Sequence, residues 1–183
     1  IDAGRMVFLS GPSGSGKSLL LRAIAELDPH EGEVWLGAEP RSGMAPPLWR
    51  RRVGLLPAES AWWAETVGEH LPPTASASVM AGWLESLGFS AEVLGWSVTR
   101  LSTGERQRLA LARLLAQRPE ALLLDEATAN LDPRSRDQVE ALVQNYRQSA
   151  QAAVLWVSHD PAQCQRLGGR AYLIHDRALV PEP

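Results

Sequence analysis

The stretch from Gly11 to Ser18 has the residue types and the spacing to bind a polyphosphate. It reads GPSGSGKS and fits the phosphate-loop pattern G-x-x-x-x-G-K-[ST] at every fixed position. Its glycines would let the backbone N–H groups and the N-terminus of a following helix come close to phosphate oxygens. Lys17 would reach the terminal phosphates, and the Ser18 hydroxyl would bind Mg²⁺. The predicted nucleotide contacts are Gly11, Pro12, Ser13, Gly14, Ser15, Gly16, Lys17, Ser18 and Leu19.

The residues on either side of this stretch favour a phosphate loop over a chance turn rich in glycine and serine. An apolar run at 6–9 precedes it and predicts a short buried strand. Residues 19–25 are rich in leucine and alanine and predict a helix. A phosphate loop needs this order of strand, loop and helix. The sequence therefore predicts that the protein binds a nucleoside triphosphate.

Further polar groups follow two apolar runs. Asp125 and Glu126 come directly after 121–124, and His159 comes shortly after 153–157. Because ligands of an open parallel sheet bind at the carboxyl ends of its strands, we expect these groups to share a site with the phosphate loop. We predict that Asp125 holds Mg²⁺ directly or through water and that Glu126 is the general base. His159 would bind the terminal phosphate or position Glu126 and the attacking water. The predicted catalytic residues are Glu126, His159 and Lys17.

Structural roles are the alternatives for these groups. An acidic pair after an apolar strand can cap a helix or lie in a solvated turn, but a phosphate loop in the same chain favours catalysis. His159 ends a run typical of a buried strand. The other histidines, in turn-like or unpatterned places, are expected at the surface: His30, His70 and His175.

Strands that alternate with helices predict a mostly parallel sheet with helices on both faces. The predicted fold class is α/β, a P-loop NTPase with such a sheet, a small helical subdomain and a reduced antiparallel β part. In Asp132-Pro133 the sequence has an N-cap followed by a proline suited to the first turn of a helix. The remaining expected elements are helices at 105–117, 134–147 and 161–167, strands at 33–37 and 53–56, a loop at 38–47 and a closing hairpin of 171–174 with 178–180.

A shift in composition toward Ala, Ser, Gly and Trp marks residues 58–100 as the helical subdomain. Tryptophans are concentrated there: Trp62, Trp63, Trp83 and Trp96. Such a cluster forms either a small core of its own or a partner surface, and large apolar residues are usually inside. We still expect Trp62 or Trp63 to be partly exposed. The predicted organisation is one domain, 1–183, whose core comprises 1–57 and 101–183.

The bulk properties exclude several classes of protein. The chain of 183 residues is 45% hydrophobic, which is typical of a globular protein and not of a disordered one. A net charge of −3 gives no general attraction to nucleic acid, so no nucleic-acid partner is expected. The single cysteine, Cys164, suits a reducing compartment. The longest apolar run, 152–157, is far shorter than the ~20 residues that span a bilayer, and residues 1–5 show no signal sequence. We therefore expect a soluble intracellular protein.

Four motifs in one order resemble those of the ATP-binding cassette (ABC) ATPases. They are the phosphate loop, the segment LSTGERQR at 101–108, the run LLLDEATANLD at 122–132 and the triplet SHD at 158–160. The similarity covers nearly the whole chain. By this resemblance, 101–105 is the signature motif, a helix N-terminus that closes over the ATP held by the other subunit. The implied contacts are Ser102, Thr103, Gly104 and Glu105.

The resemblance also implies how the protein works. Two copies, or this chain and a related cassette, would pair head-to-tail with two ATPs between them, and residues 129–132 would cross the interface. ATP and Mg²⁺ are the implied cofactors. Hydrolysis would open the dimer and drive an integral membrane transporter subunit, with this chain on the cytoplasmic face of the inner membrane. The segment 58–100 would be the docking surface, with its tryptophans as anchors.

The chain departs from the family's pattern at three places. Ala58 stands where the family usually has a glutamine that senses Mg²⁺ and couples to the partner, with Glu59 as a possible substitute. Thr103 replaces the usual middle glycine of the signature, a milder change. The family also stacks the adenine on an aromatic residue upstream of the phosphate loop, whereas the first tryptophan here is Trp35. We expect either weak base stacking or a stacking strand outside this sequence.

Three other functions fit part of the sequence. The main alternative is a soluble ABC ATPase that acts on nucleic acid or ribosomes, but the chain is acidic and carries no long coiled-coil insertion or second cassette. A small-molecule kinase would explain Lys17 and Ser18 but not the signature or His159. A nucleotide-gated module without hydrolysis would fit Ala58 but not Glu126 and His159. The predicted function is therefore an ATP-hydrolysing subunit of an ABC transporter.

Overall fold

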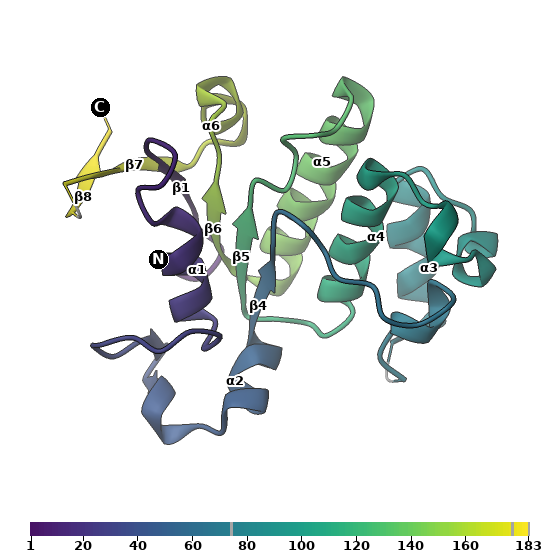
Figure 1. The fold of residues 1–183 in the computed structure, drawn as a ribbon, viewed down its shortest axis with the longest axis horizontal. Helices are drawn as coiled ribbons and strands as arrows, with labels where there is room; N and C mark the ends of the chain where they lie inside the picture. The colour runs from purple at the N-terminus through teal and green to yellow at the C-terminus, as the bar shows by residue number, and fades with distance from the viewer. Residues whose placement is uncertain (74, 177, 183) are drawn as a thin grey trace.

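A six-stranded sheet forms the centre of the computed structural model, which describes residues 1–73, 75–176 and 178–182. The strand order is β4-β5-β6-β1-β7-β8, and every neighbouring pair except β7 and β8 is parallel (Figure 1). The predicted mostly parallel sheet with a closing hairpin is confirmed. The strands are β1 (Met6–Ser10), β4 (Val53–Leu56), β5 (Ala121–Asp125), β6 (Ala153–Val157), β7 (Arg170–His175) and β8 (Ala178–Pro181).

Helices cover both faces of the sheet because its central strands are apolar on both faces. In β6, Val154 and Trp156 belong to one core cluster, while Leu155 and Val157 belong to the other. Figure 1 shows α4 and α5 on one side of the strands and α1 on the other. The first side holds α4 (Thr103–Leu115), α5 (Pro133–Ala150) and α6 (Pro161–Leu167), and the second holds α1 (Lys17–Ile24) and α2 (Pro46–Arg52).

The region between α1 and β4 differs from the prediction. The strand expected at 33–37 is reduced to β2 (Trp35–Leu36), which pairs with β3 (Glu39–Pro40), so the antiparallel part is small. The predicted loop at 38–47 is wrong at its end, because α2 begins at Pro46. Prolines at the first positions of a helix need no hydrogen-bonded N–H and suit the helical φ. The two prolines therefore start a helix here.

Side-chain caps place the starts of α4 and α5 slightly earlier than expected. The predicted N-cap is confirmed, since the Asp132 carboxylate accepts a hydrogen bond of 3.1 Å from the Ser135 N–H. Hydrogen bonds with Ser135 lower the pKa of Asp132. The cap of α4 is Ser102, so this helix begins at Thr103 and not at Glu105.

The segment 58–100 contains less helix than predicted. Its α-helix is α3 (Ala77–Ser86), accompanied by short 3₁₀ turns at 68–70, 91–95 and 98–100. The buried residues of α3, Met80 and Leu84, belong to the same cluster as the sheet residues under α4 and α5. These residues of the segment 58–100 therefore extend the main core of the protein. Figure 1 shows α3 at the end of the molecule opposite β8.

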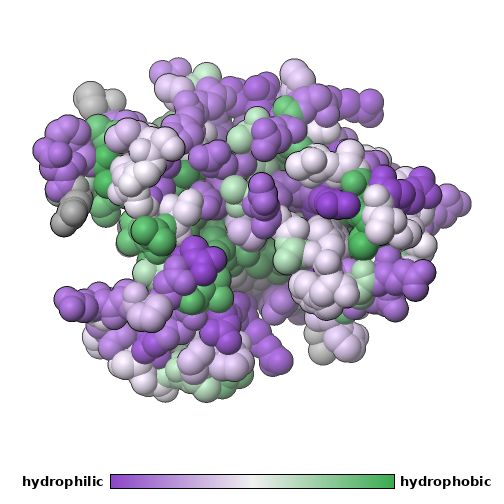
Figure 2. Space-filling model, in the orientation of Figure 1, coloured by the Kyte–Doolittle hydropathy of each residue, from purple (hydrophilic) through white to green (hydrophobic). Residues whose placement is uncertain are grey.

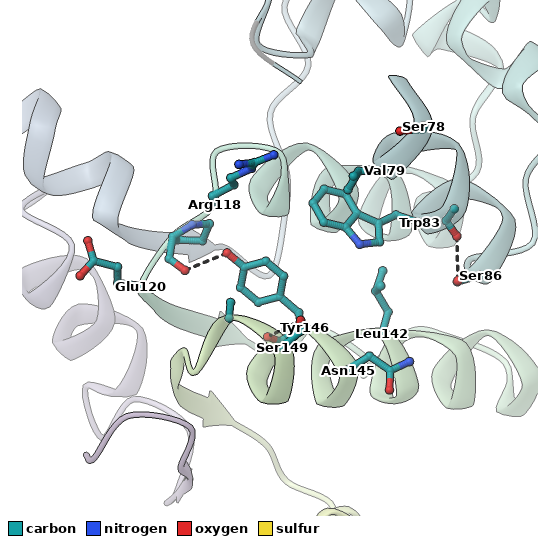
Figure 3. Close-up of a pocket in the computed structure, with 13 residues that line it drawn as sticks. Ser78, Val79, Trp83, Ser86, Arg118, Glu120, Leu142, Asn145, Tyr146 and Ser149 are labelled. Atoms are coloured by element: carbon teal, nitrogen blue, oxygen red, sulfur yellow. Dashed lines mark hydrogen bonds between the residues drawn. The ribbon is translucent and has the colours of Figure 1, made fainter. Parts of the chain in front are cut away.

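A cavity of about 600 Å³ lies between α3 and α5 (Figure 3). Trp83 of α3 and Tyr146 of α5 meet there edge to face, with ring centroids 6.2 Å apart. The Tyr146 hydroxyl donates a hydrogen bond of 2.8 Å to the Pro119 carbonyl, just before β5. Burial raises the pKa of Tyr146 to about 12, so the phenol remains a neutral donor at ordinary pH. These contacts join the segment 58–100 to the core.

Apolar surface remains exposed around α1. Figure 2 shows hydrophobic residues over this part of the molecule, and Leu19 of α1 is 65% exposed. A cavity of about 860 Å³ lies beside α1, β1 and β7, lined partly by Leu20, Ile24 and Tyr172. None of the helices in the described ranges has both the length and the apolarity needed to cross a bilayer.

Candidate nucleotide site

The phosphate loop connects β1 to α1 and depends on its glycines. Gly11, Gly14 and Gly16 have φ values of 143°, 78° and 97°, a region that side chains rarely adopt. A Cβ atom on Gly11 would also lie 3.0 Å from the Ile174 carbonyl oxygen. Gly16 precedes α1 without a side-chain cap, and the first turn of α1 contains no acidic residue. The helix N-terminus is therefore open to an anion.

Lys17 lies on the loop that it is predicted to serve. Its ammonium donates hydrogen bonds of 2.8 Å to the Gly11 carbonyl and 3.0 Å to the Pro12 carbonyl. The residue is only 7% exposed. The loop's own carbonyls thus hold a positive charge beside the backbone that would bind phosphate.

The sheet register places Asp125 at the same edge as the phosphate loop. Leu9 of β1 and Asp125 of β5 are both aligned with Val157 of β6, so two strand spacings, roughly 10 Å, separate them. Asp125 is 7% exposed, and no basic side chain of the described ranges forms an ion pair with it. Ser18, in the first turn of α1, is exposed. A carboxylate and a hydroxyl are oxygen donors of the kind that Mg²⁺ prefers.

Glu126 and His159 contact each other at this edge. The His159 Nε2 atom lies 3.3 Å from a Glu126 carboxylate oxygen, and both side chains remain partly exposed. Glu126 has φ 48°, and its N–H donates a hydrogen bond of 3.1 Å to the Val157 carbonyl. The structure thus brings together the two residues that the sequence predicts to act on the attacking water. Their catalytic roles stay predictions.

The signature segment forms a capped helix start at the surface. Ser102 is exposed, and its Oγ accepts a hydrogen bond of 3.3 Å from the Glu105 N–H. The Glu105 carboxylate in return accepts hydrogen bonds of 2.8 Å from the Ser102 N–H and hydroxyl, and these lower its pKa. Thr103 is also exposed, while a Cβ on Gly104 would lie 3.2 Å from Leu131. The signature therefore lies close to Leu131, within residues 129–132.

Gln107 is a residue whose role the sequence did not reveal. It is 9% exposed, and its amide donates a hydrogen bond of 2.9 Å to the Pro57 carbonyl and accepts one of 3.0 Å from the Ser60 hydroxyl. It thereby ties the loop after β4, where Ala58 is exposed, to α4. Its position four residues before the buried Leu111 was a signal that it faces the core.

The Trp63 side chain lies at the surface. It is 73% exposed, which confirms the expectation that Trp62 or Trp63 is partly exposed. The expected surface role of His70 is wrong: it is 6% exposed, and its Nε2 accepts hydrogen bonds from the Trp63 and Ala64 N–H groups. The Arg113 guanidinium lies 4.7 Å from the Trp62 ring centroid and 4.9 Å from the Trp63 ring centroid, and burial lowers the pKa of Arg113. An exposed, immobilised tryptophan is typical of a binding anchor.

Comparisons with known proteins show which family the chain resembles. The family model described as ABC transporter matches residues 1–129. The aliphatic sulfonates import ATP-binding protein SsuB 3 of Nocardia farcinica is 41% identical over 180 residues, covering 98% of this chain and 70% of that protein. The probable iron export ATP-binding protein FetA of Escherichia coli (strain K12) is 32% identical, and the match covers 87% of this chain and 75% of that protein. A dimeric post-hydrolysis structure of the ATP-binding cassette MJ0796 with ADP and Pi has a TM-score of 0.84 and 26% identity. The match covers 100% of this chain and 86% of that chain.

Proposed function

This chain belongs to the ABC transporter family, and from that premise we propose how its residues divide the work of an ATP-hydrolysing transporter subunit. The observation that carries the assignment is one sheet edge that holds the phosphate loop, Asp125 and the Glu126–His159 pair. Lys17 and the loop N–H groups would bind the phosphates of ATP. Glu126 would take a proton from the attacking water, and His159 would hold Glu126 in place.

We assign Mg²⁺ to Ser18 and Asp125. The Asp125 carboxylate is buried and has no basic partner in the described ranges, and a metal ion would compensate such a buried charge. No group of three or more His, Cys, Asp or Glu in the described part of the chain could hold a metal alone, so the phosphates of ATP and water would complete the coordination. The metal would neutralise charge on the phosphates.

Removal of Mg²⁺ tests this assignment. EDTA is expected to reduce phosphate release by the purified protein to background, and excess Mg²⁺ should restore it. Asp125→Asn keeps the size of the side chain but removes its charge, and should lower hydrolysis at least ~100-fold even in excess Mg²⁺. Asp137→Asn, an exposed carboxylate on α5, is the control and should hydrolyse ATP at the wild-type rate. Full hydrolysis by Asp125→Asn would contradict the assignment.

We further propose that the protein acts as a two-fold dimer, as its own homodimer or with a related cassette, docked on an integral membrane transporter subunit at the cytoplasmic face of the inner membrane. The segment 58–100 would form a subdomain that carries the docking surface. Trp63 supports this, because its indole is exposed while backbone hydrogen bonds to His70 and contact with Arg113 fix its position. A rigid aromatic anchor loses little conformational entropy on binding.

Substitution of Trp63 tests the docking surface. Trp63→Ala is expected to leave ATP hydrolysis by the free protein unchanged and to lower its affinity for inverted membrane vesicles from the source cells about tenfold. The measurement is co-sedimentation over a series of vesicle concentrations. Trp35→Ala removes another exposed tryptophan, 60% exposed on β2, and should bind like the wild type. Equal losses in both variants, or none in either, would contradict docking through Trp63.

A further inference from the structure

A buried hydrogen-bond network joins the turn after Glu126 to the helix after His159. Gln163 of α6 is 1% exposed, and its amide nitrogen donates hydrogen bonds of 3.0 Å to the Thr128 hydroxyl and 3.0 Å to the Glu140 carboxylate of α5. Its two N–H groups are therefore both used. One side chain connects three separate segments of the chain.

Glu140 and Arg166 fix the other side of the network. Glu140 is 5% exposed, and a buried carboxylate is stable only when it is paired. Arg166 donates to both of its oxygens, at 2.8 Å and 3.3 Å, and also lies 3.4 Å from a carboxylate oxygen of Asp160. The other oxygen of Asp160 accepts a hydrogen bond of 3.0 Å from the Ala162 N–H at the start of α6. The residue next to His159 is thus anchored to α5.

Glu126 needs such support because its backbone is strained. A non-glycine residue in the left-handed region is less stable than in ordinary conformations, and its surroundings must hold it there. Glu126 has φ 48°, and its carbonyl accepts a hydrogen bond of 3.0 Å from the Ala129 N–H within the turn. Thr128 is the residue of this turn that the network reaches.

We propose that Gln163 is a positioning residue for ATP hydrolysis. It holds the turn after Glu126 at a fixed place relative to α6, and so sets the distance between Glu126 and His159. This inference rests on the catalytic roles proposed for those two residues. A glutamine suits the position because its amide supplies two N–H donors, whereas a carboxylate would supply none and would lie beside Glu140.

Two substitutions test this inference, and each removes one end of the hydrogen bond between Gln163 and Thr128. Thr128→Val keeps the shape of the side chain, and Gln163→Leu keeps most of its volume. Each is expected to lower kcat about tenfold while KM and the Kd for ATP stay within twofold, since small displacements of a catalytic group slow the chemical step. The double variant should be no slower than the slower single variant, because both remove the same link. Thr128→Ser, which keeps the hydroxyl, should retain the wild-type kcat.

A matched control separates positioning from stability. Gln144 of α5 donates a hydrogen bond of 2.9 Å to the Leu167 carbonyl at the end of α6, so Gln144→Leu removes an α5–α6 contact that does not include the turn after Glu126. It should keep the wild-type kcat. A kcat loss as large as that of Gln163→Leu, or a full kcat in Thr128→Val, would overturn the proposal. The catalytic assignment fails separately, if Glu126→Gln keeps its hydrolysis.

Discussion

Lys17→Ala is expected to lower the affinity for ATP at least ~100-fold, or about 3 kcal/mol. The ammonium already lies on the loop, held by the Gly11 and Pro12 carbonyls, so its removal takes a positive charge from the place where phosphates would bind. Charge-assisted hydrogen bonds contribute about 1.5–3 kcal/mol each, and a triphosphate would receive more than one. Isothermal titration calorimetry with ATP measures the loss.

Because Lys17 is buried, two control variants are needed beside Lys17→Ala. Lys17→Met keeps most of the buried stem and removes only the charge, so it should lose the same affinity with an unchanged circular dichroism spectrum. Arg22→Ala removes a positive charge from the exposed side of α1, where Arg22 pairs with Asp28, and should bind ATP within twofold of the wild type. Unchanged affinity in Lys17→Met would refute the phosphate-loop assignment.

The Glu126→Gln protein is expected to form a dimer, and so to double its mass in solution, when Mg-ATP is added. The amide cannot accept the proton of the attacking water, so hydrolysis should fall at least ~100-fold while ATP stays bound. In a two-fold dimer with ATP between the subunits, bound nucleotide holds the pair closed. Light scattering should therefore show 19.9 kDa without nucleotide and about twice that mass with it.

Two comparisons make the mass measurement decisive. Glu92→Gln changes an exposed carboxylate outside the site and should return to the monomer mass as ATP is consumed, like the wild type. A Glu126→Gln protein that binds ATP and stays a monomer would contradict the ATP-sandwiched dimer. It would leave the ATP assignment itself intact, because Lys17 tests that separately.

The sequence predicted those parts of the fold that depend on local pattern. Residues 121–124 are apolar without alternation, and they form β5 with both faces buried. The phosphate loop was predictable because its spacing encodes both the backbone conformation and the chemistry. The gathering of Asp125 and His159 near the loop followed from one rule of sheet topology.

The remainder depended on tertiary contacts that no local pattern contains. Gln163 meets Thr128 across 35 positions and Glu140 across 23, so neither contact is visible in a sequence window. His70 looked like a surface residue, yet three-dimensional packing places it under Trp63. The start of α2 was missed for a different reason: two prolines indicate a loop unless they stand at the first positions of a helix.

The contact between Gly104 and Leu131 has a consequence for a dimer. The signature of each subunit would face the ATP bound by its partner, whereas Leu131 belongs to the segment that follows the subunit's own Glu126. A Cβ on Gly104 would lie only 3.2 Å from Leu131, so the two residues are close neighbours. Because packed groups transmit displacement, a shift at one ATP would reach the other. Such energetic coupling is reciprocal. Cooperativity between the two nucleotides would therefore arise inside each subunit, where Gly104 leaves space for the Leu131 side chain.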